Sequence, residues 1–233
     1  MQESTGGFLL IDKPAGWTSF DVIAKLRGIT GIKKIGHTGT LDPFATGLLV
    51  CAVERGATKH IDSLMGLPKT YEATFVLGAT TETLDTESPA IPAPTAPTCS
   101  EAEIDAAIAS MLGDQLQIPP MFSAIKQNGK KLYELARAGK TVDRAPRPIT
   151  ISTFERTAPI RTNGTLIELD ARITVSSGTY IRVIAQDLAA KLATTGYLTT
   201  LRRTAVGDYT INHAHTLTSI TRENWRSLLV MLL

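Results

Sequence analysis

Residues 36–47 read GHTGTLDPFATG, and this stretch combines three glycines, one proline and one carboxylate. Glycine enters the positive-φ region without steric cost, so the stretch predicts a loop with unusual main-chain angles. Its carboxylate is Asp42, and His37 lies five residues earlier. A rigid loop that presents one acid between packed elements is a common form of active site. The same residues also fit an Asx-type turn around Asp42, and the pattern alone leaves both interpretations open.

Apolar runs flank this loop on both sides. Residues 8–11 (FLLI) predict a short buried strand, and residues 47–53 predict a second one. Between them, a capping pattern at Thr18 predicts a helix over residues 19–27, ended by the glycines at 28 and 31. The side chains expected to share one face of that helix are Phe20, Ile23, Ala24 and Arg27.

The rest of the chain alternates between strand and helix patterns. Further strands are expected at 70–77, 148–154, 165–175 and 198–206, and further helices at 101–112, 130–138, 181–195 and 219–233. Strands outnumber helices and their order is mixed. The pattern therefore predicts an α+β fold, with a central mixed or antiparallel sheet and flanking helices.

Composition excludes several classes of protein. The chain has 233 residues with 43% hydrophobic content, enough for one large core or two modest domains. No apolar run is long enough to span a bilayer, and the N-terminus lacks the basic region of a signal peptide, so we expect a cytoplasmic protein. Cys51 and Cys99 lie far apart, and His213 and His215 form the one close histidine pair without a third ligand nearby. We therefore expect neither a disulfide framework nor a metal site.

Positive charge is concentrated in one segment. Residues 117–148 hold seven basic side chains and two acidic ones, a net charge of +5, whereas the whole chain carries +2 and the remainder therefore −3. Phe122 and Tyr133 are interleaved with these charges. A local basic patch is typical of a protein that grips a polyanion, although a solvated surface loop has the same composition.

Five blocks of sequence carry a family resemblance. GHTGTLDPFATGLL (36–49) resembles the catalytic motif of the TruB-type tRNA pseudouridine synthases. Four other blocks resemble further motifs of that family in the same order: LLIDKPAGWTSFDV (9–22), KTYEATFVLGATTETLDTES (69–88), IPPMFSAIKQNGKKLYELARAGK (118–140) and SSGTYIRVIAQDLAAKLATTGYLTTLRRTAVGDY (176–209). The resemblance covers residues 7–210, and agreement of five blocks in order is far more specific than one short motif.

The resemblance implies the pseudouridine synthase fold, with a catalytic cleft across its central mixed sheet, and also a function and a set of site residues. It implies isomerisation of uridine-55 in the T-loop of tRNA to pseudouridine, without metal, nucleotide or organic cofactor. Asp42 would be the nucleophile. The substrate contacts would be His37 on the RNA loop, Tyr71 stacked on the target base, Tyr180 and Arg182 beside the acid, and Leu201 lining the pocket. The basic segment resembles the insertion that clamps the T-stem loop, with Lys126, Lys130, Lys131, Arg137 and Lys140 as RNA contacts.

Each assigned role has a structural alternative. Tyr71, Tyr180 and Leu201 also fit ordinary core packing. His37 also fits a hydrogen-bond donor that holds the loop, and Arg182 also fits a surface residue in the first turn of its helix. A guanidinium beside Asp42 would favour the ionised carboxylate, which makes Arg182 the natural partner of that acid.

The domain organisation and the alternatives complete the expectations. Residues 1–215 are expected to form the synthase domain with 117–148 as its RNA-clamping insertion, and 216–233 a C-terminal helix. Many members of the family continue into a small β-barrel RNA-binding domain called PUA, for which these residues leave no room. We expect a monomer with no membrane contact that binds tRNA weakly and in a salt-sensitive way. A non-catalytic module that binds and refolds tRNA is the alternative, and a synthase acting on another RNA, like the guide-dependent relatives, is a third option.

Overall fold

The computed structural model describes residues 6–127 and 129–232, and the chain divides into two compact units. Unit 1 comprises Met1–Glu72 and Leu201–Leu233, and unit 2 comprises Ala73–Thr200. Strands β4 (Lys69–Leu77) and β13 (Gly196–Val206) each contribute residues to both units.

Unit 1 is built on a short mixed sheet. Its strand order is β15-β1-β3-β13, in which β1 and β3 are antiparallel while β1–β15 and β3–β13 are parallel. Apolar side chains alternate along β1 and β3 and form one cluster on each face of the sheet. The elements are β1 (Gly7–Lys13), α1 (Ser19–Thr30), β2 (Ile35–His37), β3 (Thr46–Val53), α2 (Glu54–Thr58), α3 (Ile61–Met65), β14 (Tyr209–Thr210), the 3₁₀ turn η1 (Ile211–His213) and β15 (His215–Thr216).

Helix α1 begins at Ser19 as the sequence predicts, but it continues through Gly28 to Thr30 and buries a different face. Thr18 and Asp21 form a reciprocal capping box, and a left-handed Gly31 ends the helix. The buried side chains include Val22, Ile23 and Leu26. The predicted face was wrong for Phe20 and Ala24, which are both exposed, because the cluster against β1 and β3 takes the stripe that starts at Val22. Phe20 is 66% exposed and lies under the Arg27 guanidinium.

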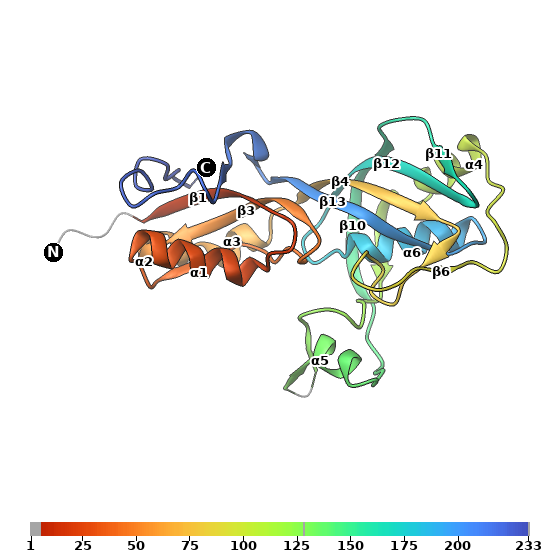
Figure 1. Ribbon diagram of the computed structural model, residues 1–233, viewed down its shortest axis with the longest axis horizontal. Coiled ribbons are helices and arrows are strands. Elements are labelled where there is room, and N and C mark those ends of the chain that lie inside the picture. The colour runs from red at the N-terminus through yellow and green to blue at the C-terminus, as the bar shows by residue number, and fades with distance from the viewer. Residues whose placement is uncertain (1–5, 128, 233) are drawn as a thin grey trace. The chain divides into compact units, whose positions relative to one another are not determined.

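In unit 2 the strand order is β13-β4-β12-β10-β7. Helix α4 is capped by the predicted Ser100–Glu103 box. Figure 1 shows hairpin β8–β9 and α5 standing away from the strands of this unit. The elements are β5 (Ala79–Thr80), β6 (Ile91–Pro92), α4 (Glu101–Ala109), β7 (Gly113–Gln117), β8 (Lys126–Gln127), β9 (Lys130–Lys131), α5 (Leu132–Arg137), β10 (Arg147–Arg156), β11 (Arg161–Asn163), β12 (Leu166–Val175) and α6 (Ile181–Lys191).

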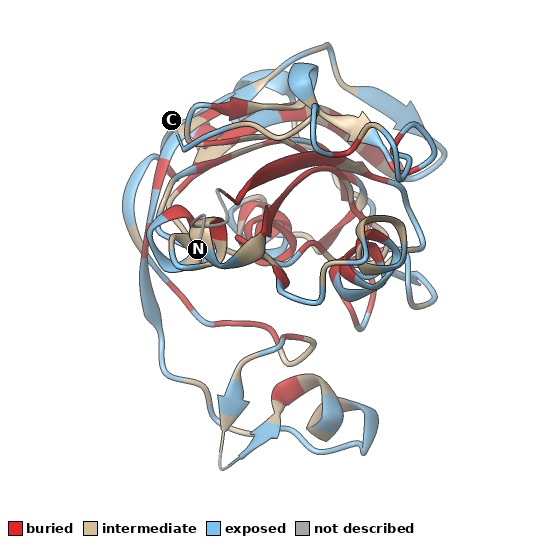
Figure 2. Cartoon of the chain, turned by 90° about the vertical axis from the view of Figure 1, so that its left-hand side faces the viewer, coloured by how far each residue is buried: buried red, intermediate tan, exposed pale blue. Residues whose placement is uncertain are grey.

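The predicted α+β class with a mixed central sheet is confirmed. In Figure 2 the buried residues gather in the strands and in parts of the helices, whereas the segment around α5 is mainly exposed. No helix among the described residues is long and apolar enough to cross a membrane.

The helix predicted over 219–233 is wrong for the described residues 219–232, which form turns. Thr221 and Asn224 make the reciprocal bonds of a capping box. The main-chain bonds that follow join residues three apart (Ser227 to Asn224, Leu228 to Trp225 and Leu229 to Arg226), so the segment forms turns and no α-helix. The apolar residues are still buried in part, because Trp225 packs in the cluster of β1 and β3 and Val230 bridges to Phe8.

Candidate active site

The loop that joins β2 to β3 (residues 38–45) carries Asp42, whose side chain is half-buried. The carbonyl of Asp42 accepts a 3.1 Å hydrogen bond from the amide of Ala45, which closes a tight turn. Three side chains from three other elements of unit 1 bind the main chain of this loop. The loop is therefore a fixed structure rather than a loose connection.

Ser19 holds the residue before the acid. Its buried hydroxyl accepts from the amide of Leu41 at 2.9 Å and lies 3.2 Å from the carbonyl of the same residue, to which it donates. Both main-chain groups of Leu41 are thus satisfied by one side chain in the first turn of α1. This two-point contact fixes the position from which Asp42 projects.

Lys13 holds the residue after the acid. This lysine is fully buried at the end of β1, and its ammonium donates to the carbonyls of Pro14, Trp17 and Pro43, the last at 3.3 Å. The amide of Gly16 adds a 2.8 Å bond to the Pro43 carbonyl. A buried ammonium needs such oxygen partners, because an unpaired charge in a core is very costly.

Arg203 supports the other side of the loop from β13. Its buried guanidinium donates to the carbonyls of Leu48 at 2.7 Å, Gly39 at 3.1 Å and Thr40 at 3.5 Å. Gly47 lies opposite Arg203 in the parallel pairing, with a φ of +100°. A Cβ at Gly47 would lie 2.3 Å from the Arg203 carbonyl oxygen, so this position requires glycine.

Burial shifts two basic groups of unit 1, Lys69 and His37, toward their uncharged forms. Burial, with the charge of Arg203 as a smaller cause, lowers the pKa of Lys69 to about 8 and also lowers the pKa of His37. Lys69 is buried and donates to the carbonyls of Met65 and Leu67.

The structure shows one function of His37 within the loop. Its Nδ1 accepts a 3.3 Å hydrogen bond from the amide of Gly39. The ring is therefore neutral with its proton on Nε2, which agrees with the lowered pKa. The alternative that His37 donates a bond to hold the loop was wrong in direction, because the ring accepts. Contact of its Nε2–H with RNA stays a prediction.

Tyr71 and Leu201 are both buried, Tyr71 on β4 and Leu201 on β13. Their burial fits the core-packing alternative for each. Stacking by Tyr71 on a base and the pocket role of Leu201 stay predictions.

Arg182 is the centre of a buried polar group in unit 2. The arginine is 3% exposed, so the alternative of a surface residue was wrong. Its guanidinium donates to the carbonyls of Thr83 at 2.7 Å and Phe122 at 3.0 Å, and its Nε lies 3.5 Å from Oδ2 of Asp85. Pairing of Arg182 with Asp42 stays a prediction.

Asp85 is a site candidate that the sequence reasoning missed. It is 2% exposed, and its Oδ1 accepts from the hydroxyl of Thr83 and the amide of Glu87. The residue lies in the block TTETLDTES, which the family resemblance includes without a role for this acid. The signal that could have indicated Asp85 is its position as the one charged residue in the stretch TLDT (83–86).

Tyr180 is half-buried and lies at the N-cap of α6. The side-chain amide of Gln117 contacts its main chain twice: Oε1 accepts from the Tyr180 amide at 2.8 Å, and Nε2 donates to the Tyr180 carbonyl at 3.2 Å. Gln117 was also missed, because a single glutamine at the end of a strand gives no local signal.

The basic segment presents most of its charge to solvent. Among the predicted RNA contacts, Lys131 is half-buried and the others, Lys126, Lys130, Arg137 and Lys140, are exposed. Lys126 and Lys131 face each other across hairpin β8–β9, an arrangement that repulsion destabilises in isolation. Lys131 and Arg137 both lie over the ring of Tyr133, at 5.2 and 5.5 Å. The segment thus gathers cations around one aromatic ring.

Comparison with known proteins identifies the family. The family model described as "TruB family pseudouridylate synthase (N terminal domain)" matches residues 27–181. A relative from Arthrobacter sp. (strain FB24) called tRNA pseudouridine synthase B is 44% identical over 93% of this chain and 71% of its own length. A protein of the same name from Nocardia farcinica (strain IFM 10152) is 46% identical over 94% and 71%.

The chain belongs to the TruB family of pseudouridylate synthases.

The fold agrees with this assignment. A solved structure described as "Crystal Structure of a Cbf5-Nop10-Gar1 Complex" superposes on 92% of this TruB-family chain with a TM-score of 0.68 and 26% identity. The chain spans about half of that protein, 53% of its length. The matched family segment contains Asp42, Tyr71 and Tyr180, while Arg182, Leu201 and Arg203 lie beyond its end.

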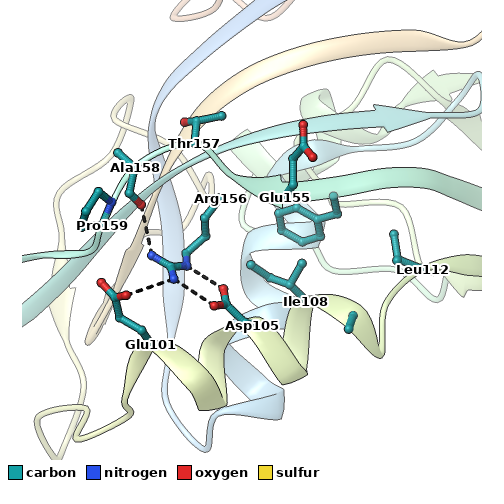
Figure 3. Close-up of a pocket in the computed structure, with 11 residues that line it drawn as sticks. Glu101, Asp105, Ile108, Leu112, Glu155, Arg156, Thr157, Ala158 and Pro159 are labelled. Atoms are coloured by element: carbon teal, nitrogen blue, oxygen red, sulfur yellow. Dashed lines mark hydrogen bonds and ion pairs between the residues drawn. The ribbon is translucent and has the colours of Figure 1, made fainter.

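A hollow of about 500 Å³ lies between α4 and β10 in unit 2 of this TruB-family chain (Figure 3). Its arginine, Arg156, is paired with both oxygens of Asp105 and with Glu101, and donates to the Ala158 carbonyl. With Glu155 the lining carries three carboxylates against one guanidinium. This charge disfavours a polyanion, so the hollow does not compete with the Asp42 loop as an RNA site.

Proposed function

We propose that this chain converts uridine-55 in the T-loop of tRNA to pseudouridine, with Asp42 as the nucleophile. The names of the relatives from Arthrobacter and Nocardia support tRNA as the substrate. The observation that carries the proposal is the loop of residues 38–45, which Ser19, Lys13 and Arg203 hold through its main chain. Such a loop presents one carboxylate in a fixed position.

The reaction explains why one fixed carboxylate is needed. The N1–C1′ bond breaks, the base turns, C5 joins C1′, and the proton lost from C5 is balanced by the one gained at N1. Atoms and electrons are conserved, so the isomerisation needs no redox or energy cofactor. A nucleophile is needed to hold the sugar or the base while the base turns, and an ionised carboxylate is suited to this.

The other site residues receive roles on the flipped uridine. A uridine that leaves its stack loses a few kcal/mol of stacking and pairing, which an aromatic ring offsets in part. Tyr71 supplies that ring, Leu201 shapes the pocket, and the Nε2–H of His37 donates to the RNA loop. Tyr180 and Arg182 act on the same uridine from the start of α6, and the guanidinium of Arg182 stays charged throughout.

The basic segment holds the T-stem loop in this proposal. The facing pair Lys126 and Lys131 is relieved when a phosphate lies between the ammonium groups, and Tyr133 offers a ring at the same place. We further propose that the protein acts as a monomer in the cytoplasm, where its substrate is found.

The test maps the product on the RNA. A full-length tRNA transcript is incubated with the protein, treated with carbodiimide and alkali, and read by primer extension, which stops beside pseudouridine. The expected result is one new stop, at position 55, which is absent when the transcript carries cytidine there. Tight binding without any stop would overturn the proposal in favour of a tRNA-binding module, and a stop at another position would overturn the assignment of uridine-55.

A further inference from the structure

Helix α6 starts without a side chain of its own that caps it. Its N-cap is Tyr180, whose side chain makes no capping bond, and the residue three positions later is Val183. In a capping box, a glutamate or glutamine at that third position accepts from the amide of the N-cap residue. Valine cannot do so, and α6 therefore needs this partner from elsewhere in the fold.

Gln117 supplies it from the end of β7. The side chain is 3% exposed, and its Oε1 accepts from the Tyr180 amide at 2.8 Å, the bond that a capping box would provide. Its Nε2 donates to the Tyr180 carbonyl at 3.2 Å, and that carbonyl also accepts from the amides of Val183 and Ile184 in the first turn. One amide thus fixes both main-chain groups at the start of the helix.

We propose that Gln117 is a positioning residue for the reaction: it fixes the main chain at Tyr180, and with it the first turn of α6 that carries Arg182. The inference rests on the proposed function, in which both residues act on the uridine. The segment that follows Gln117 also contacts Arg182 directly, because the carbonyl of Phe122 accepts from the Arg182 guanidinium at 3.0 Å. The start of the basic segment and the start of α6 are therefore joined at two points.

The chain offers a matched control on the same strand. Gln115 lies two residues before Gln117 and hence on the same face of β7, and it is half-buried. Its Nε2 makes only a long 3.4 Å contact with the carbonyl of Met111, away from α6. Gln115→Met and Gln117→Met make the same chemical change, and only the second removes the contacts to Tyr180.

The experiment measures single-turnover pseudouridine formation and tRNA affinity for wild type, Gln115→Met, Gln117→Met and Gln117→Glu. We expect Gln117→Met to lose about ten- to a hundred-fold in rate, the range for a reactive group misplaced by about 1 Å, with affinity for tRNA within about two-fold of wild type. Gln117→Glu keeps the acceptor for the Tyr180 amide, so its rate should lie between those of wild type and Gln117→Met. Gln115→Met should match wild type.

The outcomes separate this inference from the proposed function. If wild type forms no pseudouridine, the proposed function itself fails. If wild type is active and Gln117→Met turns over at the wild-type rate, the positioning role is overturned. If Gln117→Met only lowers the fraction of folded protein and each folded molecule reacts at the wild-type rate, Gln117 has a structural role and the inference is overturned. An equal loss of rate in Gln115→Met would also overturn it.

Discussion

Replacing Ser19 with alanine removes the hydroxyl that holds the loop beside Asp42. The amide and the carbonyl of Leu41 then lose bonds of 2.9 and 3.2 Å in a buried place. An unsatisfied buried polar group costs about 1–3 kcal/mol, so two groups that relax in part should cost about 2–4 kcal/mol of stability. Alanine is the better helix former at this first position of α1, so the helix itself should not lose stability.

Hydrogen exchange and kinetics test this prediction together. A loss of about 2–4 kcal/mol should speed exchange of the Leu41 amide by about 30- to 900-fold, and pseudouridine formation should slow because Asp42 is less well fixed. The control is Thr18→Ala, which removes the helix cap at the neighbouring residue, costs about 1 kcal/mol and should leave the rate unchanged. Equal behaviour of the two variants in exchange and in rate would refute the reasoning.

Three further predictions follow from the same structure. Gly47→Ala should cost about 3 kcal/mol or more in urea unfolding, because its Cβ meets the main chain of β13 at 2.3 Å, whereas Gly28→Ala on the exposed side of α1 should stabilise slightly; equal effects would contradict the packing argument. Asp85→Asn should lower the free energy of unfolding by about 3 kcal/mol, because it leaves the Arg182 guanidinium buried without its carboxylate. An unchanged urea midpoint would contradict this and show that the main-chain carbonyls alone stabilise the buried guanidinium. Burial lowers the pKa of His37 below its usual 6.5, so below pH 6.5 the unfolded chain takes up a proton that the folded chain does not. The free energy of unfolding should therefore decrease as the pH is lowered below 6.5. The decrease should be smaller in His37→Gln, and an equal decrease would show that the histidine is not the cause.

Local patterns in the sequence predicted much of the fold. The capping boxes at Thr18 and Ser100 were read correctly because all their partners lie within three residues. The alternating apolar residues located the main strands, because that period reports one buried face directly. A helix was predicted over 219–233, but the main-chain bonds from Asn224 onward join residues three apart, and the described residues form turns instead.

The supports of the candidate site could not be predicted in the same way. Ser19 binds a residue 22 positions away and Arg203 one 155 positions away, so no short window of sequence contains both partners. Arg203 is one of two neighbouring arginines in a strand, and only the pairing of β13 with β3 shows that its side chain is buried behind the loop. The sequence indicated the acid through its glycine-rich surroundings, and the contacts that hold it became visible only in the fold.

The most direct test of the account uses tRNA labelled with tritium at C5 of its uridines. Joining C5 to C1′ expels that label into water, so release reports the reaction itself. The account predicts release equivalent to one uridine per tRNA by the wild type and none by Asp42→Asn, with both proteins folded and binding tRNA equally. Release by Asp42→Asn at the wild-type rate would contradict the central claim, because the carboxylate that the loop holds would then have no part in the chemistry.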